Sequence, residues 1–184
     1  MNVCYKLNST LKLLKWVYRK ICFFDNSAYS GVMTQFPRTS QEHYLTGQAA
    51  LNIPNDDGSF ADWHFTEVFL SGRGRFPIAG ENFPDTSELL GSYGIRECAG
   101  VLRRFGLALG EGEKVYAANH VRAVLDLVVK TLAKGRIPEH VTIEDTLDTP
   151  EGRRELQEQL HRLKERITDR VTLSLLEQWE QQQH

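Results

Sequence analysis

Apolar residues repeat at the spacing of an α-helix between Ala117 and Lys134, and this stripe constrains the fold more than any other feature. Its members recur every three or four residues: Val121, Val124, Leu125, Val128 and Leu132. Gly135 ends the pattern, and Pro138 prevents its continuation. Because such a stripe has to be buried against other elements, we predict a mainly α-helical chain that forms a single compact domain.

A second stripe begins at Pro150, which follows Thr149, a residue suited to cap the start of a helix. Its first apolar members are Leu156, Leu160, Leu163 and Ile167. The pattern then continues through Val171, Leu175, Leu176 and Trp179. We predict either one long helix or two helices that separate near Thr168 and Asp169. The stripe is expected to pack into the core, and a homodimer seam along it is the alternative.

Shorter elements are predicted in the middle of the chain. Asn55-Asp56-Asp57-Gly58 has the composition of a tight turn, which would close a short β-hairpin. Two short helices are expected between Asp85 and Gly106, the second of them from Ile95 to Phe105. Besides the residues of the stripes, the predicted core contains Trp63, Phe65, Leu89 and Leu102.

The first 32 residues differ in composition from the rest of the chain. They hold five basic residues and one acidic residue, a net charge of +4, which leaves −6 for residues 33–184. We therefore predict that residues 1–32 are a basic N-terminal extension outside the domain, which comprises residues 33–184. An amphipathic helix that binds an anionic membrane surface is the alternative for this segment.

Composition and charge exclude several classes of protein. The net charge of −2 gives the chain no general attraction for a nucleic-acid backbone. No apolar run approaches the roughly 20 residues that span a bilayer, so we expect no transmembrane segment. The three cysteines have no paired spacing, which indicates a reduced, cytoplasmic protein. The sequence contains no recognisable cofactor or metal-binding motif, and we predict neither a cofactor nor a metal ion.

The helix predicted from Ala117 to Lys134 carries four side chains with directional hydrogen-bonding groups: Asn119, His120, Arg122 and Asp126. We interpret them as a polar face that binds a protein partner, because arginine is enriched at the energetic centres of interfaces. The glycine-rich loop from Ser71 to Asp85, with Arg73 and Arg75, is assigned to the same interface. This interpretation predicts that Arg122→Ala weakens the complex without unfolding the chain.

Two other functions are consistent with the sequence. Asp62, His64 and Glu67 place carboxylates beside an imidazole, as a small enzyme with a general base requires. Arg73 or Arg75 would then hold an anionic substrate. The other alternative is a DNA-binding helix-turn-helix between Asp85 and Gly106, whose second helix would present the three arginines Arg96, Arg103 and Arg104.

Four segments carry a resemblance to a protein family. They are His43-Tyr44-Leu45-Thr46-Gly47, Leu51-Asn52-Ile53-Pro54, Asp62-Trp63-His64-Phe65 and the segment from Tyr116 to Asp126. On these segments the chain resembles small bacterial proteins encoded beside abortive-infection-type nucleotidyltransferases. The resemblance covers residues 33–179 and carries over no catalytic residue. It implies a non-enzymatic, antitoxin-like partner of a nucleotidyltransferase toxin, in a two-gene bacterial module of the toxin-antitoxin or phage-defence type.

Overall fold

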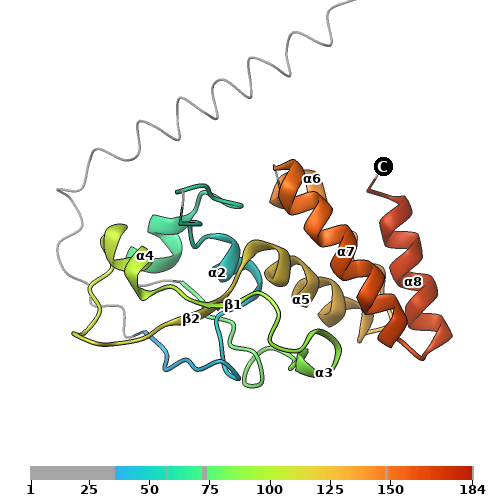
Figure 1. The fold of residues 1–184 in the computed structure, drawn as a ribbon, viewed down its shortest axis with the longest axis horizontal. Coiled ribbons are helices and arrows are strands. Elements are labelled where there is room, and N and C mark those ends of the chain that lie inside the picture. Colours follow the sequence, from blue (N-terminus) through green and yellow to red (C-terminus); the bar gives the residue numbers. More distant parts are fainter. Residues whose placement is uncertain (1–35, 57, 72–73, 148, 184) are drawn as a thin grey trace, which may run out of the picture. The chain divides into compact units, whose positions relative to one another are not determined.

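The computed structural model describes residues 36–56, 58–71, 74–147 and 149–183. Within these ranges the chain is mainly helical with one two-stranded sheet, which confirms the predicted fold class (Figure 1). None of the helices in these ranges is both long enough and apolar enough to cross a membrane. Residues 1–32 lie outside the described part of the chain, so their assignment as an extension stays a prediction.

Three long helices follow the two apolar stripes: α5 (His120–Leu132), α7 (Pro150–Arg166) and α8 (Arg170–Gln181). Each begins with a side chain that accepts a hydrogen bond from the backbone N–H three residues further on, namely Asn119, Thr149 and Asp169. The cap at Asp169 divides the C-terminal stripe into two helices, one of the two predicted arrangements. In Figure 1, α7 and α8 lie side by side, and α5 packs between them and the sheet.

The remaining elements are short. They are α2 (Gly47–Leu51), the π-helical turn η1 (Thr66–Leu70), α3 (Ser87–Leu90), α4 (Ala99–Arg104), α6 (Ile143–Thr146) and the strands β1 (Ile95–Glu97) and β2 (Tyr116–Ala118). The two strands pair antiparallel, with Ile95 opposite Ala118. The sheet is therefore formed by other residues than those that flank the Asp57-Gly58 step, where the hairpin was predicted. β1 also replaces the first turn of the helix predicted from Ile95 to Phe105, so this region does not have the helix-turn-helix outline.

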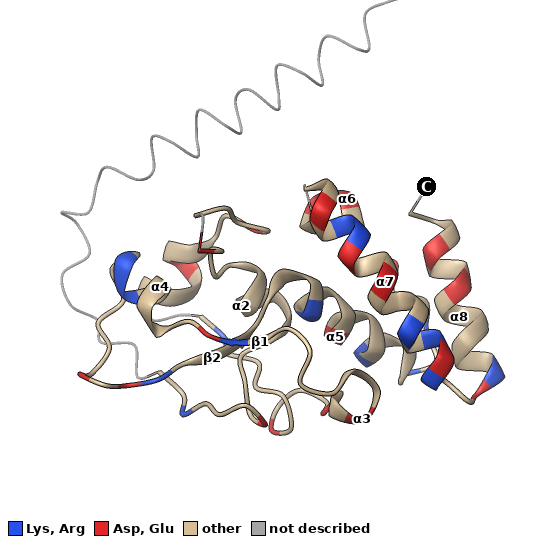
Figure 2. Cartoon of the chain, in the orientation of Figure 1, with Lys and Arg blue, Asp and Glu red and all other residues tan. Residues whose placement is uncertain are grey.

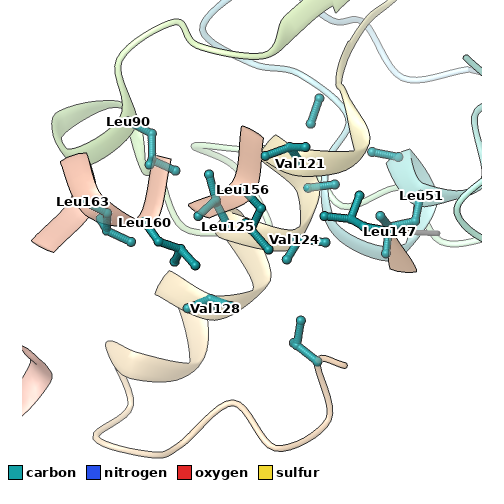
Figure 3. Packing of buried hydrophobic residues seen from close by; sticks show 14 of the residues in the cluster. Leu51, Leu90, Val121, Val124, Leu125, Val128, Leu147, Leu156, Leu160 and Leu163 are labelled. Atoms are coloured by element: carbon teal, nitrogen blue, oxygen red, sulfur yellow. The ribbon is translucent and has the colours of Figure 1, made fainter. Parts of the chain in front are cut away.

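The larger hydrophobic cluster surrounds α5. Figure 3 shows Val121, Val124, Leu125 and Val128 of α5 against three leucines of α7, as the stripes predict. Trp179 of α8 belongs to the same cluster, is completely buried, and donates a hydrogen bond from its indole Nε1 to the backbone oxygen of Val141 at 2.9 Å. Burial of this many large side chains supplies the main stabilisation of the helical part.

A second hydrophobic cluster, in which aromatic side chains are prominent, lies around η1 and α4. Phe65 and Phe69 pack with ring centroids 4.9 Å apart, and Leu102 and Cys98 are completely buried beside them. Burial raises the pKa of the Cys98 thiol to about 12. Phe65 and Leu102 confirm the predicted core. Trp63 does not belong to it, because its side chain is 64% exposed.

Candidate functional site

Two of the four polar residues predicted to form an interface on α5 have structural roles at its start. Asn119 caps the helix, because its Oδ1 accepts a hydrogen bond from the N–H of Arg122 at 2.8 Å. His120 is buried, and its Nε2 lies 2.8 Å from the backbone oxygen of Ile53. A carbonyl oxygen can only accept, so Nε2 carries the proton and Nδ1 accepts from the amide nitrogen of Asn55 at 3.2 Å. These bonds fix the loop after α2 onto α5.

Arg122 is completely buried, and all five of its N–H donors are used. Nε donates to Asp126 Oδ1 at 2.9 Å, and Nη1 donates to the backbone oxygens of Gly91 and Tyr93, each at 2.8 Å. Nη2 donates to the hydroxyl of Tyr44 at 2.6 Å and to that of Thr86 at 2.9 Å. The guanidinium therefore has no group left to offer another molecule.

Asp126 is equally buried and fills its acceptor positions. Besides Arg122, its oxygens accept from the hydroxyls of Thr86 at 2.5 Å, Thr46 at 2.5 Å and Tyr44 at 3.1 Å. Burial and the neighbouring carboxylate of Asp126 raise the pKa of Tyr44 to about 12, so this phenol keeps its proton at neutral pH. The result is a closed network that joins α5 to the segments around Thr46, Thr86 and Tyr93.

Gly94 shows how closely the chain approaches this network. Its φ of +71° lies in the region that favours glycine, and a Cβ placed on it would lie 2.7 Å from Arg122 Cβ and from Asn119 Oδ1. Its backbone oxygen accepts a hydrogen bond from the N–H of Asn119 at 2.6 Å. A side chain at this position would therefore separate β1 from the start of α5.

The prediction that α5 presents a polar interface is wrong for His120, Arg122 and Asp126, because all three are buried in the fold. A buried and fully hydrogen-bonded ion pair cannot contact a partner unless the chain unfolds locally. The sequence pattern was read correctly as a helix with a separate polar face. That face is covered because the segments around Tyr44, Thr86 and Tyr93 lie over it and bond to Arg122 and Asp126.

The arginines of the other predictions do not come together in one site. Arg73 lies outside the described residues, and Arg75 is exposed. Arg96 lies in β1 and donates to the backbone oxygen of Pro54, while Arg103 donates to those of Gly110 and Glu113. Arg104 lies 3.7 Å from the carboxylate of Asp56. Arg96, Arg103 and Arg104 do not form the face of one recognition helix.

The alternative polar cluster is brought together as predicted. His64 lies between two carboxylates, with its Nε2 3.7 Å from Asp62 Oδ1 and its Nδ1 3.4 Å from Glu67 Oε2. Asp62 is itself held in place, because its other oxygen accepts hydrogen bonds from Gln48 at 2.6 Å and from Asn52 at 3.2 Å. The cluster therefore has a fixed geometry although it lies at the surface.

Trp63 projects from this cluster at the surface, although the sequence predicted it to lie in the core. Its indole stacks on the imidazole of His64, with ring centroids 4.1 Å apart and an angle of 29° between the planes. Its backbone N–H donates to Asp62 Oδ1 at 2.7 Å. The polar residues on either side of Trp63 in the sequence were the available signal that this tryptophan is exposed.

The cluster has a geometry that favours binding over acid-base chemistry on an anion. Both contacts of His64 with carboxylates are longer than 3.3 Å, and two carboxylates beside the imidazole would repel the anionic substrate that the enzyme alternative requires. No group of side chains in the described part of the chain has the composition and spacing of a metal site. Comparisons of the chain with protein families, curated proteins and solved structures found no match.

Proposed function

We propose that this chain is a non-enzymatic interaction protein that binds a protein partner through the Trp63 surface, defined as Asp62, Trp63, His64 and Glu67. The indole of Trp63 supports this most strongly, because it is 64% exposed and yet held in place by its stack with His64. A rigid aromatic side chain offers a large contact area and loses little entropy on binding. Tryptophan is also enriched among the residues that dominate binding energies.

The charges of the Trp63 surface indicate the chemistry of the partner. The Glu67 side chain is 76% exposed, and Asp62 adds a second carboxylate within the same cluster. An arginine or lysine of a partner can rest on the indole face while it is paired with these carboxylates. The net charge of −6 on residues 33–184 would attract a basic protein surface over longer distances.

The resemblance noted for the sequence indicates which partner to test first. One of the four segments that carry it is Asp62 to Phe65, which contributes most of the Trp63 surface. We take the partner to be a nucleotidyltransferase encoded by the neighbouring gene, with a basic surface that fits the Trp63 surface. In this proposal the chain acts in the cytoplasm as the antitoxin-like member of the pair.

Trp63→Ala should weaken the complex at least about 30-fold, because removal of a hot-spot residue costs about 2 kcal/mol or more. The experiment co-expresses the chain with the nucleotidyltransferase, purifies both, and measures their dissociation constant by calorimetry. Val171→Ala is the matched control, because Val171 is 65% exposed and lies on α8, outside the Trp63 surface. Both variants should keep the unfolding temperature of the parent chain, since neither residue is buried.

Equal affinities of the two variants for the nucleotidyltransferase would contradict the assignment of the surface, and so would a loss confined to Val171→Ala. A chain that dimerises through Trp63, detected by light scattering of the parent and the variant, would replace the proposed partner with a second copy of the chain.

A further inference from the structure

A cleft of about 350 Å³ lies between α7 and the segment that joins α3 to β1, away from the Trp63 surface. The side chains that define its chemistry are Leu90, Tyr93, Gln159, Arg162, Leu163 and Arg166. The volume falls within the range of small-molecule sites in proteins. Figure 2 shows that charged residues of both signs occur along α7, but the residues lining this cleft include two arginines and no carboxylate.

The two arginines of the cleft are one helical turn apart and lack an acidic partner in the described part of the chain. Arg166 donates from Nη1 to the backbone oxygen of Leu89 at 2.6 Å, which fixes its guanidinium at the edge of the cleft. The side chain of Arg162 forms no hydrogen bond or ion pair with any described residue. Like charges at this spacing repel each other slightly, whereas the position of Arg166 in the last turn of α7 by itself favours a cation.

Gln159 supplies the amide of the cleft. The residue is only 8% exposed and lines the cleft, and its side chain forms no hydrogen bond with any other described residue. Its amide is not a buried group without a partner, so the exposed part of the side chain is the amide, which faces the water of the cleft. A bound molecule with a polar edge would replace this water as the partner of the amide.

The opposite wall of the cleft is held rigidly. Tyr93 donates its hydroxyl proton to Glu155 Oε1 at 2.5 Å, and burial raises the pKa of this phenol well above its usual range. The backbone oxygen of Tyr93 accepts from the buried guanidinium of Arg122. Leu90 and Leu163, both labelled in Figure 3, are almost completely buried and contribute apolar atoms to the lining of the cleft, Leu163 from α7 itself. The cleft thus combines a cationic edge, an amide and an apolar wall.

We propose that this cleft binds a small organic phosphate monoester of the size of a mononucleotide. A phosphate monoester carries nearly two negative charges at neutral pH, which matches the two guanidinium groups of Arg162 and Arg166 better than a single carboxylate does. The amide of Gln159 would pair with a polar edge of the attached group. The apolar part of the ligand would lie against Tyr93, Leu90 and Leu163. This site is independent of the proposed protein interface.

The test is a titration of the full chain with AMP, ribose 5-phosphate, inorganic phosphate and adenosine, followed by amide chemical shifts in NMR spectra. We expect saturable shifts at residues 159–166 with the three phosphates and none with adenosine. AMP should bind more tightly than inorganic phosphate, because only AMP reaches the apolar wall. Equal affinities for inorganic phosphate and for AMP would show a site for free phosphate. This result would overturn the proposal that the ligand is an organic phosphate.

Arg162→Gln should weaken the binding of AMP at least about tenfold and leave the unfolding temperature unchanged, because Arg162 holds no other residue. Arg154→Gln is the matched control, since Arg154 lies on the same helix, is 67% exposed and faces only Glu151 at 3.8 Å. Gln159→Leu should also weaken AMP binding, because it removes the amide that faces the cleft. Absence of binding to any phosphate, or equal losses in Arg162→Gln and Arg154→Gln, would overturn the proposal.

Discussion

Replacement of Arg122 by methionine should lower the free energy of unfolding by about 3–5 kcal/mol, the usual cost of removing one partner from a buried ion pair. The variant leaves Asp126 completely buried without its cation, and it removes the donors to the backbone oxygens of Gly91 and Tyr93. Methionine fills much of the volume of the arginine side chain. The loss of unfolding free energy therefore reports the missing polar contacts more than a cavity. Urea unfolding followed by circular dichroism gives the value.

The double variant Arg122→Met/Asp126→Leu separates the charge from the rest of the network. It removes both members of the ion pair, so it should recover part of the loss. Recovery should be incomplete, because the hydroxyls of Tyr44, Thr46 and Thr86 would then lose their acceptor. Arg154→Met is the exposed control and should change the free energy by less than about 0.5 kcal/mol. A loss below about 1 kcal/mol for Arg122→Met would contradict a structural role for the pair.

Trp179→Ala should destabilise the chain by a similar amount, about 3–5 kcal/mol, because it creates a large cavity in the cluster around α5. The indole is completely buried and also donates to the backbone oxygen of Val141, so both apolar contacts and one hydrogen bond are lost. Thermal and urea unfolding measure the effect.

Trp179→Phe distinguishes these two contributions. Phenylalanine keeps most of the apolar contacts but leaves Val141 without its donor, so the loss should be smaller, about 1–3 kcal/mol. Gln178→Ala, next to Trp179 on the exposed face of α8, should be nearly neutral. If Trp179→Ala unfolds at the same midpoint urea concentration as the parent chain, the packing of α8 does not depend on this side chain.

Local patterns were sufficient to predict the long helices. The stripes of α5 and α7 and the caps at Thr149 and Asp169 act over three or four residues, so they can be read directly from the sequence. The strand β1 was missed because it has only three residues and pairs with a segment about 20 positions further along the chain. The residues that follow β1 have a helical pattern, and the predicted helix was therefore started too early, at Ile95.

The candidate sites depended on contacts between distant segments. Arg122 was predicted to face a partner because it lies with Asn119, His120 and Asp126 outside the apolar stripe, but its own partners Tyr44 and Thr86 lie 78 and 36 residues away. Trp63 was placed in the core because large aromatic residues are usually buried. Its neighbours Asp62 and His64 hold it at the surface instead, through a stack and a hydrogen bond. These contacts are local, and the general preference of tryptophan for the core outweighed them in the prediction.

Cys98 makes the opening of the aromatic cluster measurable by chemistry. Its thiol is buried, donates weakly to Val115 at 3.4 Å and has a pKa of about 12, so a disulfide reagent can modify it only when the cluster opens. In a chain with serine at positions 4 and 22, Cys98 is the single thiol, so the modification rate reports the exposure of this residue. Ala117 and Ala118 are adjacent in β2 but belong to different clusters. We therefore expect the two clusters to open together, so that the free energy that protects the thiol equals the global free energy of unfolding.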